Sequence, residues 1–356
     1  MIFRLKSPVK RATVLLAVLT AVFAAPLWSA GETPDGPVIW ETALPASEET
    51  YHEAVETLLR AVETERGSLL RPGERGKAAL KIYTGSGPGL ATPKPLVRAV
   101  IHGLRERGFE KENIVLLDLN EHRLRRSGFL PPLSDGRDDF EGHPVWVLDR
   151  GEHFHPDWYY DSPLPPRNEP GFTPERRIPG FGEDRADDRK SHLAAPLILD
   201  VDFWINLPMF SDHRQLGLNG ALVNASLSNA GNTLRFFNSS TTGPAAVAEI
   251  AAIPELRERW ALTLASLERV QFIGGPVFNS LYTTGEPVLV ATLDPVLLDA
   301  RVLQMINQAR ENRNFSPLDS DLPMLDYAQQ VGLGSRIFTM DRKIRLDSQG
   351  LDQQVR

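Results

Sequence analysis

Residues 78–119, AALKIYTGSGPGLATPKPLVRAVIHGLRERGFEKENIVLLDL, carry the pattern that decides the fold class. The apolar run at 78–84 predicts a strand, and a helix with Pro93 at its first position follows. Gly108 predicts the end of this helix, and a second apolar run at 113–119 predicts another strand. Strand, helix and strand in this order are typical of a parallel βαβ unit.

The same alternation continues on both sides of this unit. Further strands are expected at 145–148, 197–207 and 288–291. Further helices are expected at 48–65, 217–228, 244–252, 255–270, 295–313 and 322–331. We therefore predict an α/β fold with a mostly parallel sheet, helices on both faces and a long irregular insertion.

The insertion covers residues 120–195, where prolines, charges and aromatic residues dominate. Loops of that length are usually functional or disordered. Because Trp158 and Tyr160 stand among the prolines, we expect residues 150–195 to form an ordered aromatic loop over the strand ends.

Residues 1–30 are expected to target the protein for export. Four basic residues lie within the first eleven positions, and an uncharged apolar run follows at 12–28. Small residues favour cleavage after Ala24; a retained N-terminal anchor is the alternative reading. We expect a periplasmic or secreted protein whose residues 31–356 form a single α/β domain.

The composition excludes several functions. The 356 residues include 42% hydrophobic residues, which permits a sizeable core, and their net charge is −7. An acidic chain opposes nucleic-acid binding, and no stretch beyond the N-terminal segment is long and apolar enough for a membrane span. The absence of cysteine excludes disulfides and cysteine-ligated iron–sulfur clusters. The sequence leaves any other cofactor open, a metal in an enzyme site among them, and the expected partner is a small molecule.

Several segments, in the right order, resemble the family known as domain of unknown function 362. They are LRPGE at 70–74, LKI at 80–82, INLPMFSDH at 205–213, LGLNGALVN at 216–224, NTLRF at 232–236, GGP at 274–276, DPVLLD at 294–299 and VGLG at 331–334. The resemblance covers a core at residues 68–336. It implies the α/β fold and points to Arg235 as a ligand-binding residue, but it implies no established reaction.

Four polar positions depart from the family pattern. The resemblance leads us to expect lysine at Ser211 and Val223, histidine at Phe237 and aspartate near Ser266. These departures leave open whether this chain has kept the family's activity. They predict a less positive site than in relatives.

His213 follows a buried-looking strand, where open α/β sheets place their ligand crevices. It could serve as a general base or a metal ligand, or it could simply bond to loop backbone. Lys81 lies inside an apolar strand and needs a polar partner such as Asp118. For Lys81, a catalytic role and a structural ion pair stay open.

Asp299 lies in the second turn of the expected helix 295–313, where capping does not explain a carboxylate, so we take it as a catalytic candidate. Asp294, just before Pro295, is explained by capping. Asn224, within the resemblance, is a ligand-binding candidate.

Two further motifs are weaker. His153, His155 and Asp157 alternate along an extended segment and could ligate a metal. Beyond the two histidines, however, no clear third ligand completes the set. The glycine-rich loop 85–89 precedes a helix capped by Thr92, a geometry that suits anions, but a plain turn explains it as well.

Two functions are consistent with these residues. The first is an enzyme acting on a small polar or anionic molecule, with Lys81, His213 and Asp299 as catalytic residues and Asp118, Asn224 and Arg235 as ligand-binding residues. The second is a catalytically silent binding or structural protein. They differ in whether Lys81, His213 and Asn224 converge on one cleft.

Overall fold

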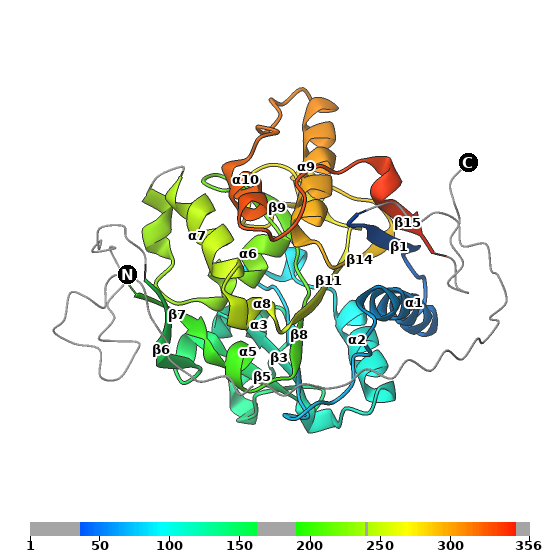
Figure 1. Cartoon of the computed structure of the whole chain (residues 1–356), viewed down its shortest axis with the longest axis vertical. Helices are drawn as coiled ribbons and strands as arrows, with labels where there is room; N and C mark the ends of the chain where they lie inside the picture. The colour runs from blue at the N-terminus through cyan, green and yellow to red at the C-terminus, as the bar shows by residue number, and fades with distance from the viewer. Residues whose placement is uncertain (1–35, 162–189, 239–240, 347–356) are drawn as a thin grey trace, which may run out of the picture. The chain divides into compact units, whose positions relative to one another are not determined.

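The core of the fold is a nine-stranded sheet whose five central strands run parallel (Figure 1). The computed structural model describes residues 36–161, 190–238 and 241–346. In spatial order, the central strands are β11 (Trp260–Ser266), β8 (Phe203–Asn206), β2 (Ala78–Lys81), β3 (Ile114–Asp118) and β5 (His143–Val147). Every neighbouring pair among them is parallel, so the predicted α/β class is confirmed.

Shorter strands and strands of opposite direction complete the two edges. At one edge, β4 (Asp139–Phe140) pairs antiparallel with β5. At the other, β14 (Val288–Thr292) is antiparallel to β11, and β1 (Ile39–Ala43) is antiparallel to β14. Finally, β15 (Lys343–Arg345) runs parallel to β1, so segments from opposite ends of the chain close this edge.

Helices cover both faces of the sheet. On one face, α1 (Glu48–Arg66) and α2 (Lys94–Glu106) pack against alternate strand residues such as Leu80, Leu116 and Ile205. The intervening residues, among them Ala79, Leu117 and Trp204, belong to the core of the opposite face. That face carries α5 (Ala195–Leu199), α6 (Ala221–Ala225), α7 (Thr242–Ala251), α8 (Pro254–Arg257), α9 (Pro295–Glu311) and α10 (Pro323–Gln330).

A second sheet stands beyond the carboxyl ends of β8 and β11. It contains β10 (Gly217–Asn219), β9 (Phe210–His213), β12 (Val270–Gln271) and β13 (Thr283–Thr284), in that order. Because β9 follows β8 and β12 follows β11, the parallel pairing continues from the first sheet into the second.

Short 3₁₀ helices connect the larger elements. They are η1 (Pro88–Leu90), η2 (Lys111–Asn113), η3 (Leu133–Asp135), η4 (Leu148–Arg150), η6 (Leu227–Asn229), η7 (Leu234–Asn238), η8 (Ser280–Tyr282) and η9 (Met340–Arg342). In the described part of the chain, no helix has the length and apolar character needed to cross a membrane.

The strand order reverses next to β2. From β2 the chain runs through α2 to β3 and on to β5 in one direction, whereas β8 and β11 lie on the other side of β2. Open α/β sheets bind ligands at the carboxyl ends of the strands beside such a reversal. Lys81 ends β2 and Asn206 ends β8, so both lie where that rule places a ligand.

Three predicted elements are wrong in detail. Residues 197–207 form the end of α5 and then β8, and the Asp202 carboxylate between them accepts hydrogen bonds from the backbone of Gly73, Arg75 and Lys77. The predicted helix 217–228 is instead β10, α6 and η6.

The predicted helix 255–270 is α8 followed by β11. Nearly every residue of β11 is buried because helices cover both of its faces. A strand buried on both faces and a buried helix both read as a continuous apolar run, which explains the error.

The expected insertion is more regular than its composition suggests. It contributes α3 (Glu121–Arg126) as well as β4 and β5 of the main sheet. The expected aromatic loop begins and ends as two antiparallel strands, β6 (Phe154–Asp161) and β7 (Lys190–Ala194). Residues 162–189, like the predicted export segment 1–30, lie outside the described residues.

Candidate functional site

Lys81 is enclosed beneath the carboxyl edge of the sheet. Its side chain is fully buried, and Nζ donates to Oδ1 of Asp118 at 2.7 Å, Oδ1 of Asn224 at 2.9 Å and the carbonyl of Ile82 at 2.7 Å. These bonds use all three donors of the ammonium. Burial lowers the pKa of Lys81, and the Asp118 carboxylate opposes that shift.

Asp118 and Asn224 extend this cluster to neighbouring elements. Oδ2 of Asp118 accepts from the backbone and the hydroxyl of Thr84 at 2.8 and 2.6 Å. Nδ2 of Asn224 donates to Oδ1 of Asn206 at 2.8 Å, and Asn206 donates to the carbonyl of Ala221 at 2.9 Å. The cluster therefore ties β2, β3, β8 and α6 together, and its contacts favour a structural role for Lys81.

Two adjoining cavities lie above this cluster. The edge cavity has a volume of about 420 Å³, and the hairpin cavity beside β6 and β7 has about 320 Å³. They share the wall residues Leu119, Asn120, Arg123, Thr233 and Leu234. Together they form one cleft along the ends of β3 and β5.

The walls of the edge cavity are mostly apolar. Asp118, His213, Asn219 and Tyr83 supply polar groups. Its apolar wall residues include Leu119, Val223, Leu227, Leu234, Phe237 and Pro276. Lys81 and Asn224 are not among the lining residues, so the predicted convergence is incomplete: His213 faces the cavity, while Lys81 and Asn224 lie beneath it.

His213 is positioned by the turn between β9 and β10. Its Nδ1 accepts from the backbone amides of Gln215 and Leu216, both at 3.2 Å, and its ring packs 5.3 Å from that of Phe237. These bonds assign the ring proton to Nε2, and burial lowers the pKa of His213, so the ring is neutral at pH 7. His213 thus offers the cavity a hydrogen-bond donor, which does not fit the predicted general base.

Asn219 provides a second donor in the same wall. Its side chain is almost fully buried, and its amide interacts with the phenol of Tyr83, where it opposes the rise in the pKa of Tyr83; no other described residue accepts from Nδ2. Tyr83 shares its hydroxyl with Ser86 at 3.1 Å, and burial raises the pKa of Tyr83. The amide has two N–H donors, and a ligand oxygen in the cavity would accept from the one that Tyr83 does not use.

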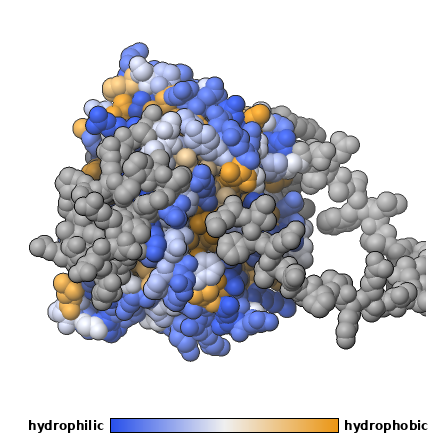
Figure 2. Space-filling view, turned by 60° about the vertical axis from the view of Figure 1, so that its left-hand side comes forward, coloured by the Kyte–Doolittle hydropathy of each residue, from blue (hydrophilic) through white to orange (hydrophobic). Residues whose placement is uncertain are grey.

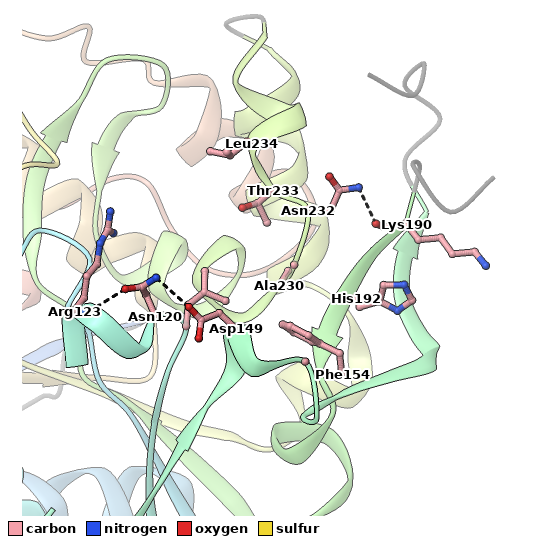
Figure 3. A pocket seen from close by; sticks show the side chains of 13 residues that line it. Asn120, Arg123, Asp149, Phe154, Lys190, His192, Ala230, Asn232, Thr233 and Leu234 are labelled. Carbon is pink, nitrogen blue, oxygen red and sulfur yellow. Dashed lines mark hydrogen bonds between the residues drawn. The ribbon is translucent and has the colours of Figure 1, made fainter. Parts of the chain in front are cut away.

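Arg123 is the cation at the junction of the two cavities (Figure 3). It lies on α3, which Asn120 caps by accepting from the Arg123 backbone at 3.0 Å. Asn120 in turn donates to Asp149 at 3.0 Å. The Arg123 guanidinium makes no ion pair with any described residue and stands away from the helix in Figure 3. It is therefore available to an anionic ligand group.

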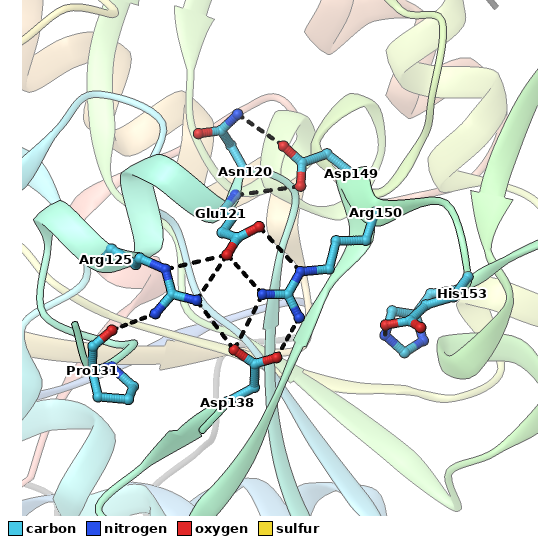
Figure 4. A network of polar contacts seen from close by, with 9 residues as sticks. Asn120, Glu121, Arg125, Pro131, Asp138, Asp149, Arg150 and His153 are labelled. Carbon is cyan, nitrogen blue, oxygen red and sulfur yellow. Dashed lines mark hydrogen bonds and ion pairs between the residues drawn. The ribbon is translucent and has the colours of Figure 1, made fainter. Parts of the chain in front are cut away.

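A network of four charges holds α3 in place (Figure 4). Glu121 accepts from Arg125 at 2.8 Å and from Arg150 at 2.7 Å, and Asp138 pairs with the same two arginines. The arginines, Arg150 foremost, lower the pKa of Glu121 to about 2. The network joins α3 to the segments flanking β5 and so positions the helix that carries Arg123.

Asp299 lies outside the cleft, under α6. Its carboxylate is fully buried and accepts from the backbone amides of Ala221 at 2.7 Å and Leu222 at 3.0 Å. Burial raises the pKa of Asp299 to about 7. A side chain on Gly220 would collide with this carboxylate, which explains the glycine. Asp299 thus caps α6 from a neighbouring helix. This capping, and not the predicted catalytic role, accounts for its carboxylate.

Arg235 stabilises the strands beside the hairpin cavity but does not line it. The guanidinium donates to Oγ of Ser191 at 2.9 Å and to the carbonyl of Asn232 at 3.2 Å, and it lies over the ring of Phe236. Its side chain is buried. The predicted ligand-binding role gives way to a structural one.

The predicted metal motif is not assembled. Nδ1 of His155 accepts from the backbone of Asp157 at 3.2 Å, and His153 packs against Trp146. Within residues 36–161, 190–238 and 241–346, no three histidine, cysteine or acidic side chains are placed to hold a metal ion.

Thr92 does not cap α2 as predicted. Its hydroxyl accepts from the backbone of Tyr83 at 2.8 Å and donates to the carbonyl of Leu207 at 2.7 Å. The N-cap residue of α2 is Pro93, which makes no side-chain cap.

Sequence reasoning missed Arg123, Asn120 and Asn219. Asn120 comes two residues after the end of β3, and this position was the available signal, because ligand groups gather at strand carboxyl ends. Arg123 was hidden by the apparent irregularity of residues 120–195. No feature of the sequence singles out Asn219.

No protein family model matches the chain, and no curated protein does. Among solved structures, a crystal structure of a Thermotoga maritima protein, a structural genomics target, is 13% identical with a TM-score of 0.39. The match covers 80% of this chain and 60% of that protein's length.

Proposed function

We propose that this protein binds a small molecule with one anionic group and an apolar body in the cleft above β3 and β5. The observation that carries this proposal is the Arg123 guanidinium, which has no ion pair among the described residues and stands where the two apolar-walled cavities meet. A guanidinium recognises a carboxylate or phosphate with paired hydrogen bonds.

The remaining polar groups of the cleft are donors for neutral oxygen atoms. His213 and Asn219 line the edge cavity; the hydrogen bonds of His213 with described residues go to Nδ1 and leave Nε2 for a ligand, and the Asn219 amide has the phenol of Tyr83 as its partner. A ligand whose anionic end meets Arg123 would place a carbonyl or hydroxyl oxygen near these donors. The apolar residues between them would cover its hydrocarbon part.

The hydropathy of the molecular surface on one side of the molecule is consistent with this proposal. Figure 2 turns forward the side of the molecule on which β6, β7 and α7 lie in Figure 1. Hydrophobic side chains there lie in a recess bordered by hydrophilic ones. An apolar recess with a polar rim is the usual form of a small-molecule site.

The resemblance to the domain of unknown function 362 family supports the same reading as a proposal. Val223 and Phe237, two positions where the resemblance leads us to expect lysine and histidine, both line the edge cavity. Because Val223 and Phe237 are apolar, the cavity favours a ligand with less charge than a site with lysine and histidine at these positions would bind. This chain is therefore proposed as a divergent member with an altered ligand.

The proposed place of action is outside the cytoplasm, in the periplasm or as a secreted protein. The support is the basic start and apolar run of residues 1–30. Intact mass measurement of the protein recovered from its native compartment tests it: a chain starting near residue 25 is expected, and one retaining Met1 contradicts cleavage.

The binding proposal is tested by calorimetric titration with octanoate and, for comparison, with the neutral octanol. We expect saturable binding of octanoate and weaker binding of octanol. The change Arg123→Gln should weaken octanoate by about 10-fold to 100-fold, because a hydrogen bond to a charged group contributes about 1.5–3 kcal/mol. Octanol affinity should stay unchanged.

Arg126→Gln is the matched control, because Arg126 lies on the same short helix but does not line the cleft. Its octanoate affinity should equal that of the wild type. Equal losses in both variants, or no loss in Arg123→Gln, would show that the cleft does not recognise the anion.

A catalytic function remains the second candidate because Asp118 and His213 line the same cavity. Three bonds from Lys81 and Thr84 already occupy the Asp118 carboxylate, which argues against its acting as a base. Turnover of octanoate esters, followed by product release and abolished in His213→Gln, would favour the enzyme.

A further inference from the structure

A third cavity, of about 420 Å³, lies at the start of α2 and is separate from the cleft. We call it the helix-start cavity. It is lined by Pro88, Gly89, Ala91, Thr92, Pro93, Lys94, Arg126, Ser127, Gly128, Met209, Glu268 and Arg269. It shares none of these residues with the edge and hairpin cavities, so a ligand here would be a different one.

The first turn of α2 has free backbone donors, and Lys94, its first residue, lines this cavity. The helix has 13 residues, Pro93 is its N-cap residue, and no side chain caps it. The amides of Lys94 and Leu96 precede the first residue that can bond within the helix, so they have no helical acceptor. Free amides and the positive end of the helix dipole together attract an anion.

Ser127 gives the second, independent indication. The residue is only 9% exposed, it lines the cavity, and its Oγ makes no hydrogen bond with a described residue. A buried hydroxyl that loses water without gaining a partner destabilises the fold. A ligand oxygen in the cavity would supply the missing acceptor.

The charges of the wall agree with this. Lys94, Arg126 and Arg269 contribute three cations, against one carboxylate from Glu268. Lys94 also lies near Glu141, outside this wall, and lowers its pKa, while Arg269 donates to the carbonyl of Gly89 at 2.9 Å. The wall therefore has surplus positive charge and several donors pointing from different elements.

We propose that the helix-start cavity binds a tetrahedral phosphate group, held by the first amides of α2, the Ser127 hydroxyl and the side chains of Lys94 and Arg126. A tetrahedral dianion offers acceptors in several directions and carries more charge than a carboxylate, which suits donors that come from a helix start, a hydroxyl and separate cations. The same chemistry admits inorganic phosphate or a phosphomonoester.

The test is a titration of the full chain with inorganic phosphate and, separately, with phenyl phosphate, followed by calorimetry and by the backbone amide resonances of Lys94 and Leu96. Saturable binding that shifts both resonances is expected. Because phenyl phosphate also fits the ligand proposed for the cleft, the two affinities are compared from the shifts of the Lys94 and Leu96 resonances. A higher affinity for phenyl phosphate by this measure identifies a phosphomonoester, and a higher affinity for phosphate identifies the free ion.

Ser127→Ala separates binding from folding. Without phosphate, its melting temperature should equal or exceed that of the wild type, because the lost hydroxyl has no partner. Its phosphate affinity should fall about 10-fold. Arg126→Gln should also bind more weakly, with a shallower salt dependence, and Arg126→Lys should restore most of the affinity.

Lys111→Gln is the control for phosphate binding, because Lys111 is exposed and lines none of the three cavities. It should bind phosphate like the wild type. The proposal is overturned if phosphate does not bind saturably, if Lys94 and Leu96 do not respond, or if Ser127→Ala and Arg126→Gln bind as well as the wild type.

Discussion

At the scale of single residues, elementary chemistry predicted which side chains form an ion pair better than it predicted whether they serve structure or function. A lysine among Leu80 and Ile82 needs a polar partner, and the predicted pair with Asp118 is confirmed. The sequence does not reveal that Asn224 and a backbone carbonyl fill the remaining donors. Whether a buried lysine is closed off or open to a ligand depends on residues more than 100 positions away.

Lys81→Met tests the structural role of this cluster. The change leaves the Asp118 carboxylate buried with only Thr84 as partner, and breaking a buried ion pair on one side costs about 3–5 kcal/mol. We expect a loss of that size in the free energy of unfolding, measured by urea titration. The same change at exposed Lys111 should have little effect. A stable Lys81→Met protein would indicate a lysine kept for binding or catalysis.

At the scale of elements, the helices with local end signals were predicted well. Asp294 caps α9 by accepting from the backbone of Leu297 at 2.8 Å, as expected from sequence, and the predicted helix 48–65 is α1, which Ser47 caps through a capping box. The errors fall on elements such as α6 and β11, which lack such signals. Their identity depends on which neighbours bury them, and α6 is capped by Asp299 from a distant helix.

The charge network on α3 predicts a pH dependence. The arginines lower the pKa of Glu121 from 4.5 to about 2 in the folded protein. A depressed carboxyl pKa stabilises the fold above the unfolded pKa, and this contribution is lost as pH falls from about 4.5 toward 2. In Glu121→Gln, the midpoint of urea unfolding should therefore fall less steeply over that interval than in the wild type.

Glu112→Gln serves as the control for this pH experiment, because Glu112 is exposed and belongs to no such network. Its pH dependence should match the wild type. If Glu121→Gln also matches the wild type, the network does not contribute to acid stability, and the position of α3 must depend on other contacts.

At the scale of the whole molecule, the sequence predicted the layers but not the order of the strands. Alternating strands and helices indicate an α/β sheet, and the clear unit around β2 and β3 places the centre correctly. The edge formed by β14, β1 and β15 could not be predicted. No local pattern shows that β1 will pair with β14, about 250 residues further along the chain, and with β15, about 300 residues further along.

A buried cluster of charges joins this distant edge. Glu41 of β1 is fully buried and lies 2.8 Å from Arg301 of α9, 3.2 Å from Lys343 and 3.3 Å from Arg345 of β15. Arg301 also contacts Glu286 at 2.7 Å, and Glu286 is about half exposed. One carboxylate thus holds cations from two elements of the C-terminal part of the chain against its first strand.

Glu41→Gln should accordingly unfold at much lower urea than the wild type. It leaves Arg301, which is almost fully buried, with Glu286 as the remaining carboxylate, and it removes the negative charge that attracts Lys343 and Arg345 of β15. The expected loss is about 3–5 kcal/mol, as for other broken buried pairs. Glu286→Gln contacts the same guanidinium from a solvent-exposed position and should cost less than about 1 kcal/mol. Hydrogen exchange should show faster exchange in β15 and β1 of Glu41→Gln than in the control. Equal stability of the two variants would mean that backbone pairing and the buried side chains of β1, rather than Glu41, close the sheet.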